Sequence, residues 1–428
     1  MSALVIFGVL TVLMLTGMPI SISLGLTVLT FLFTMTDVPL ESVALKLFTG
    51  IEKFEIMAIP FFILAGNFLT HGGVARRMIT FATTMVGHWY GGLGLAGVVA
   101  CALFAAVSGS SPATVVAIGS ILLPAMVKAG FPTRFGAGVI TTSGALGILI
   151  PPSIVMVMYS VATNTSVGAL FMAGVVPGIV LASMLGAMTW YRARKFDYPR
   201  QAKASWGERW DSFRKAIWGL LLIIVVMGGI YTGIFTPTEA AAMSAVYAFV
   251  VAVFVYKDMG MKQVPKVLLN SANMSAMLLY IITNAVLFSF IMTNENIPQA
   301  LADWMLGEGL GKIGFLLAVN VMLLIAGNFM EPSSIVLIFA PILFPVATRL
   351  GIDPVHFGIL MIVNMEIGMC HPPVGLNLYV TSSITKLGIT ELTVAVWPWL
   401  LTMLMYLALV TYWSDLTLWM PRVMGVIG

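Results

Sequence analysis

Four short polar stretches interrupt an otherwise apolar sequence, and their residue types suit the binding of ions. Each combines glycine or proline with serine, threonine, asparagine or glutamate: 108–112, 141–144, 327–334 and 364–377. Glycine and proline break helices, and a broken helix presents free carbonyls at one end and free amides at the other. Because hard cations prefer carbonyl, hydroxyl and carboxylate oxygens, these stretches predict cation sites, with anion binding at the helix N-termini.

Two acidic residues, Glu331 and Glu366, lie in these stretches, and an ionisable residue at membrane depth is a functional candidate. Other interpretations remain open. The first and third stretches are alternatively surface turns, the paired prolines are alternatively simple kinks, and each acid alternatively caps a helix or pairs locally. We interpret His371 as a packed side chain and not a proton carrier. We interpret Asn67, in a Gly-Asn-Phe motif that recurs at 327–329, as a residue of close helix packing.

The composition indicates a membrane protein. Of the 428 residues, 60% are hydrophobic and only 9% are charged, and the mean hydropathy is +1.02. A soluble domain carries about 25% charged residues, so this chain could not cover its own surface in water. Several stretches approach or exceed the length that crosses a bilayer, for example 4–18, 20–35, 217–233 and 394–413. The first of them lacks a basic flank and a small-residue cleavage site, so we expect a spanning helix and not a cleaved signal.

The sequence disfavours several other classes of protein. It contains no CxxC, HExxH or Walker A lysine motif and no haem-type histidine pair. Cys101 and Cys370 lie in apolar stretches and are interpreted as buried thiols. We therefore predict that the protein is not an enzyme, has no catalytic residues and needs no cofactor besides coupling ions. The small excess of basic over acidic residues, 21 against 17, argues against a nucleic-acid partner.

The two halves of the chain resemble each other. A constant spacing of 221 residues separates corresponding prolines: Pro124 and Pro345, Pro151-Pro152 and Pro372-Pro373, Pro177 and Pro398. Such a constant offset indicates an internal structural repeat. We therefore predict a first repeat over 1–190 and a second over 214–428, joined by a polar linker over 191–213.

Each repeat is predicted to contain about five transmembrane helices and one re-entrant helical hairpin. The hairpins span 92–129 and 313–349, and helices broken by the paired prolines span 134–160 and 355–381. A hairpin returns the chain to the face it came from, so five crossings leave the ends of a repeat on opposite faces. Two such repeats in tandem are inverted, which is typical of secondary transporters. The predicted fold class is an all-α integral membrane protein.

The basic residues predict the orientation of the chain. With the N-terminus outside, 16 of the 21 lysines and arginines fall in cytoplasmic loops and the other 5 fall outside. Cytoplasmic loops are the ones that carry an excess of positive charge. We therefore expect both termini in the periplasm and the linker in the cytoplasm. The first hairpin would enter the membrane from the cytoplasm and the second from the periplasm.

The serine tip at 108–111 with its Pro124 arm, the break at Pro151-Pro152-Ser153 and the tip at 327–334 carry a family resemblance. Over essentially its whole length, the chain resembles the large membrane subunit of tripartite ATP-independent periplasmic (TRAP) transporters. The resemblance implies a fold of the ion-transporter superfamily, in which a transport domain moves past a scaffold as an elevator. It implies sodium-driven uptake across the bacterial inner membrane. It also implies two protein partners, a small four-helix membrane subunit and a periplasmic substrate-binding protein.

The resemblance further implies which residues bind ligands, with sodium as the only metal. One sodium set would comprise Ser108, Gly109, Ser110, Ser111, Thr141, Thr142, Ser143 and Gly144. A matching set would comprise Gly327, Asn328, Glu331, Ser333, Glu366, Gly368 and Met369. The substrate would lie between the tips, near Ser110, Pro151, Ser153, Pro332 and Asn377.

The substrates of this family are usually organic anions, and overall similarity favours the sialic-acid branch. No arginine lies in the four polar stretches, so a carboxylate would bind helix N-termini, hydroxyls and sodium instead of a bidentate clamp. A polyhydroxylated monocarboxylate such as N-acetylneuraminate fits that arrangement better than a dicarboxylate. The alternatives are a C4-dicarboxylate TRAP subunit, a binding-protein-independent sodium–anion symporter of the same superfamily, and a proton-coupled carrier that uses Glu331, Glu366 or His371.

Overall fold

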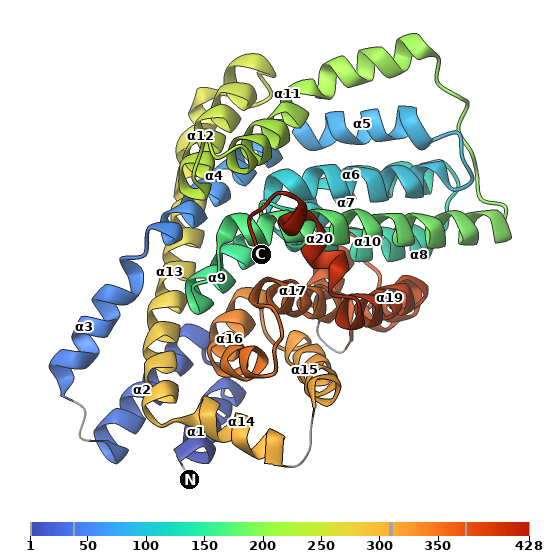
Figure 1. Ribbon diagram of the computed structural model, residues 1–428. Coiled ribbons are helices and arrows are strands. Elements are labelled where there is room, and N and C mark those ends of the chain that lie inside the picture. Colours follow the sequence, from blue (N-terminus) through green and yellow to red (C-terminus); the bar gives the residue numbers. More distant parts are fainter. Residues whose placement is uncertain (1, 37–38, 308–310, 373–374, 428) are drawn as a thin grey trace.

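The structure is a computed structural model that describes residues 2–36, 39–307, 311–372 and 375–427 (Figure 1). Helices are the only regular secondary structure within these ranges. Eight of the helical segments described are long and apolar enough to cross a membrane. The prediction of an all-helical membrane protein is thus confirmed. Pro373, in the second predicted proline pair, lies outside the described residues.

The first half of the chain runs from α1 to α10. Its elements are α1 (Ser2–Leu15), α2 (Ile20–Met35), α3 (Leu40–Ile51), η1 (Phe54–Met57), α4 (Ala58–His71), α5 (Val74–Val86), α6 (Gly92–Ser108), α7 (Ser111–Lys128), α8 (Thr133–Gly144), η2 (Ala145–Ile148), α9 (Ile154–Thr163) and α10 (Val167–Lys195).

The second half runs from α11 to α20. Its elements are α11 (Trp206–Tyr231), α12 (Pro237–Val250), the π-helical turn η3 (Val251–Val255), η4 (Met261–Gln263), α13 (Val264–Asn294), α14 (Ile297–Gly307), α15 (Lys312–Gly327), α16 (Pro332–Arg349), α17 (Pro354–Cys370), α18 (Leu376–Thr385), α19 (Ile389–Tyr412) and α20 (Asp415–Val423).

Local sequence explains where several of these helices begin. Before α12, the Thr236 hydroxyl accepts a bond from the Glu239 backbone N–H at 3.3 Å, and the Glu239 carboxylate accepts one from the Thr236 N–H at 2.8 Å. Ser205 and Glu208 form the same reciprocal pair at the start of α11. Such capping boxes satisfy backbone donors that have no partner inside the helix. The starting points of α11 and α12 are therefore set by hydrogen bonds within their own first turns.

The order of elements in the second half follows that in the first. A helical hairpin (α6–α7 or α15–α16) precedes a broken helix (α8–α9 or α17–α18), which precedes a long closing helix (α10 or α19). The stretch 134–160, predicted as a broken helix, contains most of α8, then η2 and most of α9. The stretch 355–381 contains most of α17 and the first part of α18. The helix breaks therefore fall where proline and glycine predict them.

Three features differ from the expectation. The short helices α5 and α14 precede the hairpins, and α20 follows the closing helix. These segments are too short to cross a bilayer, so a search for spanning stretches does not find them. Helix α13 runs without interruption from Val264 to Asn294. Its proline lies in the first helical turn, where proline is tolerated.

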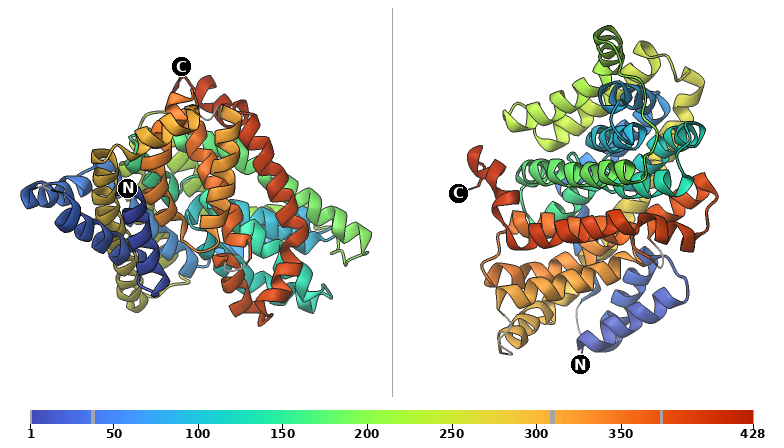
Figure 2. Two further views of the ribbon diagram at one scale, coloured as in Figure 1. Left: turned by 90° about the horizontal axis from the view of Figure 1, so that it is seen from below. Right: turned by 90° about the vertical axis from the view of Figure 1, so that its right-hand side faces the viewer.

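The helices form two groups. In the first, α4 packs against α12, and α13 packs against α2 and α3, along the left and upper edges of Figure 1. We call the described residues of 2–71 and 206–294 the outer frame. The second group comprises α6–α10 and α15–α19, whose described residues in 92–195 and 312–412 we call the inner bundle. The two halves interlock inside this bundle, because α7 packs against α18 and α9 against α16. The long helices α10 and α19, green and red in Figure 2, also lie side by side.

Candidate functional site

The first hairpin has a tip of two residues, Gly109 and Ser110, between α6 and α7. Gly109 has a left-handed φ of 60°, and a Cβ there would lie 2.9 Å from the carbonyl oxygen of Pro152. Glycine suits both this backbone conformation and the close approach. Across the tip, the buried hydroxyls of Ser108 and Thr114 bond to each other at 2.8 Å. The tip therefore packs directly against the proline break.

The second tip places an acid at the start of a helix. α16 begins at Pro332, and Glu331 occupies its N-cap position. Ser333 Oγ donates to Glu331 Oε1 at 2.6 Å, and Ser334 Oγ donates to Oε2 at 3.4 Å. The positive end of a helix stabilises a carboxylate at this position. The carboxyl group of Glu331 thus lies at the N-terminus of α16 and is held there by two serine hydroxyls.

The first broken helix supports the first tip. α8 ends at Gly144, and α9 follows the N-cap residue Ser153, whose Oγ accepts a bond from the Met156 N–H at 3.4 Å. Between them, a Cβ on Gly147 would lie 2.6 Å from the carbonyl oxygen of Ser110. Any larger residue at this position would push the tip away. The segment between α8 and α9 therefore packs directly against the tip and supports it.

The second broken helix contributes the residue that joins the two halves. Asn377, at the start of α18, donates from Nδ2 to Ser111 Oγ at 2.7 Å and lies 3.4 Å from the carbonyl oxygen of Thr141. Cys370, at the end of α17, donates from Sγ to the same carbonyl at 3.3 Å. All four residues are buried. Residues from the first tip, α8, α17 and α18 therefore meet at one point.

Two buried oxygens in α8 and α18 have no hydrogen-bond partner among the described residues: Ser143 Oγ and Asn377 Oδ1. The hydroxyls of Thr141 and Thr142 are already engaged, because they donate to carbonyls one turn earlier at 2.7 and 2.9 Å. An unpaired buried polar atom costs about 1–3 kcal/mol, so such atoms call for a ligand or another explanation. Free oxygens are thus present beside the first predicted sodium set. Gly144, also in that set, packs against α7.

The second predicted sodium set is brought together only in part. Gly327 and Gly368 touch through their backbones. The side-chain amide of Asn328 lies 3.0 Å from His371 Nδ1, which places this histidine against the tip. Glu366 is fully buried, and neither of its carboxylate oxygens has a hydrogen-bond partner among the described residues. Within that part of the chain, no hydrogen bond therefore joins Glu366 to the tip at Glu331.

A cavity of about 460 Å³ lies between the two tips and the outer frame. This volume falls within the range of roughly 300–1,000 Å³ that is usual for small-molecule sites. Bundle residues on its wall include 108–113, 331–333 and Met369, and frame residues come from α4 and α13. Glu331 is the only charged side chain among the described lining residues. Both tips therefore face one common space.

The predicted substrate contacts divide between this cavity and the layer behind it. Ser110 and Pro332 line the cavity, whereas Pro151, Ser153 and Asn377 do not. Ser153 is fully buried and caps α9, and Asn377 is fully buried against the first tip. The structure therefore places these two side chains as supports of the tips.

The frame side of the cavity carries a polar residue that the sequence interpretation assigned to helix packing. Asn67 of α4 lines the cavity, and its Nδ2 donates to Ser271 Oγ of α13 at 2.8 Å. Ser271 Oγ in turn donates to the carbonyl oxygen of Val267 at 2.8 Å, which fixes the orientation of the Asn67 amide. A Cβ on the neighbouring Gly66 would lie 3.2 Å from the Ser108 carbonyl oxygen. Asn67 therefore packs helices and also faces the cavity.

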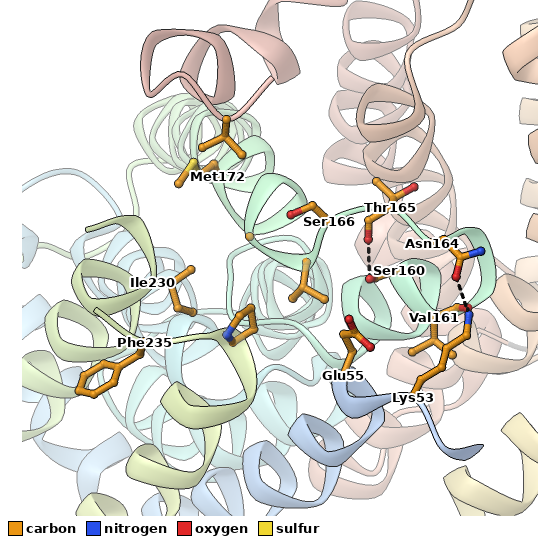
Figure 3. Close-up of a pocket in the computed structure, with 14 residues that line it drawn as sticks. Lys53, Glu55, Ser160, Val161, Asn164, Thr165, Ser166, Met172, Ile230 and Phe235 are labelled. Carbon is orange, nitrogen blue, oxygen red and sulfur yellow. Dashed lines mark hydrogen bonds between the residues drawn. The ribbon is translucent and has the colours of Figure 1, made fainter. Parts of the chain in front are cut away.

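A second cavity, of about 470 Å³, lies at another contact between the frame and the bundle (Figure 3). Lys53 and Glu55 line it from the frame, and the hydroxyls of Ser160, Thr165 and Ser166 line it from the bundle. It shares no lining residue with the cavity between the tips and contains none of the predicted site residues. The tip cavity is therefore the better candidate for the transported solute.

Comparison with known proteins identifies the family. Residues 7–416 match the family model described as "Tripartite ATP-independent periplasmic transporter, DctM component". The chain belongs to this family. It is 75% identical to the C4-dicarboxylate TRAP transporter large permease protein DctM of Rhodobacter capsulatus, over 100% of both chains. It is 48% identical to the protein of the same name in Vibrio cholerae, over 99% of this chain and 98% of that one.

More distant relatives carry other names. The sialic acid TRAP transporter large permease protein SiaM of Vibrio cholerae is 36% identical, over 97% of each chain. Among solved structures, the YdaH transporter of Alcanivorax borkumensis superposes with a TM-score of 0.63 at 16% identity, covering 89% of this chain and 90% of that one. At that identity the similarity concerns the fold alone. The arrangement of helices seen here therefore occurs in another solved transporter.

Membership of the DctM family confirms the resemblance to large TRAP membrane subunits. The protein is a multi-pass membrane transporter and not an enzyme. The predicted substrate, sialic acid, is less well supported. The relatives named for C4-dicarboxylates, at 75% and 48% identity, are more similar than the relative named for sialic acid, at 36%. The dicarboxylate alternative is therefore better supported than the sialic-acid prediction.

Proposed function

We propose that this chain is the large membrane subunit of a sodium-coupled TRAP transporter that takes up C4-dicarboxylates across the bacterial inner membrane. A small membrane subunit and a periplasmic binding protein complete the system. The observation that carries the substrate assignment is the 75% identity, over the full length of both chains, to a large permease named for C4-dicarboxylates. Sialic acid is the second candidate, supported by the 36% identity to SiaM.

The two tips present different electrostatics to a carboxylate. At the first tip, the N-cap Ser110 makes no side-chain capping bond, so the first amides of α7 have no competing acceptor from that residue. At the second tip, the Glu331 side chain makes no capping bond to the backbone either, but it brings a carboxylate to the corresponding position. Helix N-termini attract anions, and a negative charge already present repels a second one. One substrate carboxylate therefore binds at the first tip.

This electrostatic difference also removes the earlier argument against a dicarboxylate. The sequence disfavoured a dicarboxylate because no arginine offers a bidentate clamp, and none of the described residues of the tip cavity is an arginine. The amides at the start of α7, which the Ser110 side chain leaves uncapped, lie on the bundle wall of this space, and the side-chain amide of Asn67 lies on its frame wall. The apolar lining between them, which includes Met274 and Met277, suits a short hydrocarbon chain.

Sodium binds at the two tips. Ser143 Oγ and Asn377 Oδ1 are free oxygens near the carbonyl-rich ends of the half-helices α8 and α17. Glu331 and the backbone contact between Gly327 and Gly368 form the second candidate region. Neutral oxygens and one carboxylate match the preference of a hard cation. Bound sodium would hold each tip against its broken helix, which favours the conformation that binds substrate.

The inner bundle acts as the moving transport domain and the outer frame as the scaffold. The matching order of elements in the two halves and the distribution of lysine and arginine support two inverted repeats with both termini in the periplasm. The cavity lies between the tips of the bundle and the frame, so bundle movement would carry the substrate past α4 and α13. This is an elevator mechanism.

Uptake into proteoliposomes tests the proposal. They contain this chain with its small membrane subunit, and the binding protein and labelled succinate are added outside. An inward sodium gradient is imposed and then replaced by potassium. We expect uptake that needs both sodium and the binding protein. Uptake of sialic acid in place of succinate would overturn the substrate, uptake driven by a proton gradient without sodium would overturn the coupling ion, and uptake without the binding protein would indicate an independent symporter.

A further inference from the structure

A single lysine ties the outer frame to the inner bundle. Lys53 lies between α3 and η1, in the frame. Its Nζ donates to the carbonyl oxygen of Val161 at 2.5 Å and to Asn164 Oδ1 at 2.7 Å, both at the end of α9 in the bundle (Figure 3). The residues joined by these bonds lie 108 and 111 positions apart in the sequence. The contact is therefore tertiary, and no local turn enforces it.

The end of α9 is built to receive a cation. α9 ends at Thr163, and Asn164 follows in a left-handed conformation with a φ of 57°. The carbonyl of Val161 belongs to the last turn, where carbonyls have no partner inside the helix. The negative end of the helix dipole attracts a lysine ammonium. The ammonium of Lys53 therefore caps α9 and neutralises its negative end.

Among the described residues, no carboxylate forms an ion pair with Lys53. Glu55 lines the same cavity, but within the described part of the chain no acidic oxygen lies within ion-pair distance of Lys53. Burial lowers the pKa of Lys53, and the nearby charge of Glu55 opposes that shift. The half-buried ammonium thus depends on α9 for its hydrogen bonds. If α9 moved away, Lys53 would need other partners or water.

Few polar contacts cross from frame to bundle. Among the described residues of the two groups, the side-chain hydrogen bonds that do so are the two from Lys53 and one from Tyr231 to the Phe171 carbonyl oxygen at 3.3 Å. The Lys53 bonds are the shorter ones and the only ones that involve a charge. A hydrogen bond is lost once donor and acceptor separate beyond about 3.5 Å. Any appreciable sliding of α9 along the frame therefore breaks this contact.

We propose that Lys53 is a state-specific latch, which holds α9 against the outer frame in the conformation described here and releases it when the inner bundle moves. This inference rests on the elevator motion of the proposed function. It assigns to Lys53 the role of setting the equilibrium between the two positions of the inner bundle relative to the outer frame. A lysine that only stabilises α9 would keep its bonds in both states. The two roles therefore differ in whether Lys53 and Asn164 separate during transport.

Spin-label distances between frame and bundle, measured on the complete membrane complex in lipid, report the conformational balance without requiring uptake. In Lys53→Met, we expect the population of the present conformation to fall about two- to tenfold relative to the other state, as expected for loss of one charged helix-end contact. Lys53→Arg retains the charge and should retain most of the balance. Asn164→Gly keeps the left-handed backbone and removes one of the two acceptors, so it should give a smaller shift.

Lys46→Met is the matched control. Lys46 lies on α3, 5.4 Å from the ring of Phe290 in the frame; it lines a cavity together with Val161 of α9, but within the described residues no hydrogen bond or ion pair joins it to the bundle. It should leave the distance distribution unchanged. Equal distributions in the Lys53→Met and Lys46→Met complexes would overturn the latch. A Lys53→Met complex that merely unfolds would show a lower thermal midpoint and a broadened distribution without a second defined distance, which would assign Lys53 a purely structural role.

Covalent closure of the contact provides the second test. In the Lys53→Cys/Asn164→Cys double variant, a short thiol-reversible cross-linker should abolish succinate uptake, and a reductant should restore it. Continued uptake while the pair is cross-linked would refute release of the latch. If the unmodified complex does not take up succinate, the proposed substrate is wrong. The spin-label populations would still show whether Lys53 acts as a latch, because that measurement does not require uptake.

Discussion

Gly327 at the end of α15 and Gly368 near the end of α17 touch backbone to backbone: a Cβ on Gly368 would lie 2.7 Å from the Cα of Gly327. The atoms in contact are main-chain atoms, which cannot rotate away as a flexible side chain would. This contact holds the second hairpin against the second broken helix, directly before the tip that carries Glu331. Glycine at both positions is therefore a requirement of packing.

Gly368→Ala should separate the second tip from its support. We expect a loss of about 1–3 kcal/mol in stability, the usual cost of overpacking, together with loss of sodium-dependent uptake. Thermal unfolding of the purified complex and uptake in proteoliposomes measure the two effects. The matched control is Gly228→Ala in α11, where an added Cβ would have no heavy atom within 4 Å. Similar stability and uptake in the two variants would show that this contact is not important.

The helix breaks were predictable from sequence because glycine and proline act locally. Ser110 and Pro332 were placed at tips by their neighbours alone, and both line the cavity. The contact between Asn377 and Ser111 joins residues 266 positions apart. Such a pairing depends on how whole helices pack, and no local pattern encodes it. This is why Asn377 was predicted as a substrate contact and is found holding the first tip.

The frame side of the site was harder to predict for the same reason. The sequence showed that Asn67 repeats a motif of the second tip, but the repeat alone did not show that α4 faces the tips. Helices α5 and α14 were missed because their lengths match neither a full crossing nor a turn. The sequence interpretation inferred the substrate from the absence of arginine. That absence does not distinguish monocarboxylates from dicarboxylates when helix N-termini supply the hydrogen-bond donors. Overall similarity to named relatives provided what this argument could not.

Glu331→Gln tests the charge at the second tip. Glutamine retains the size of the side chain and one carbonyl acceptor for Ser333, so the tip should still fold. Removing the negative charge should raise the half-saturating sodium concentration on the order of tenfold, if Glu331 helps to bind the ion. Initial uptake rates at a series of sodium concentrations measure this. Glu295→Gln, at the end of α13, is the control and should leave the sodium dependence unaltered.

Asn377→Leu tests the junction of the two halves. It leaves Ser111 Oγ without its donor and removes a free oxygen beside the first tip. We expect a loss of stability of about 1–3 kcal/mol and loss of sodium-dependent uptake. Asn284→Leu is the matched control, since Asn284 is also buried and its side-chain amide donates to the Tyr280 carbonyl oxygen at 2.9 Å within the frame helix α13. The control variant should be less stable, but its remaining uptake should depend on the sodium concentration as in the unmodified complex. The same sodium dependence in both variants would show that Asn377 does not belong to the ion site.

Asp258→Asn tests an ion-pair cluster outside the spanning segments. Asp258 bonds Arg77 and, at 2.9 Å, Arg76 on α5, and the Arg77 guanidinium lies 3.7 Å from the ring centroid of Tyr256. Burial alone would raise the pKa of Asp258, but the bonds and charges of Arg77 and Arg76 hold it below its ordinary value. A lowered folded-state pKa gives stability that is present above the ordinary value and lost as the pH falls through the lowered one.

The Asp258→Asn complex should therefore unfold at a lower temperature than the unmodified complex at about pH 7, and the difference should shrink at about pH 3. Thermal midpoints at the two pH values measure this. Asp303→Asn breaks an exposed pair with Arg349 and should change the midpoint less, because water screens that pair on both sides. A midpoint difference for Asp258→Asn that stays constant between the two pH values would show that the side chain acts through packing and not through its charge.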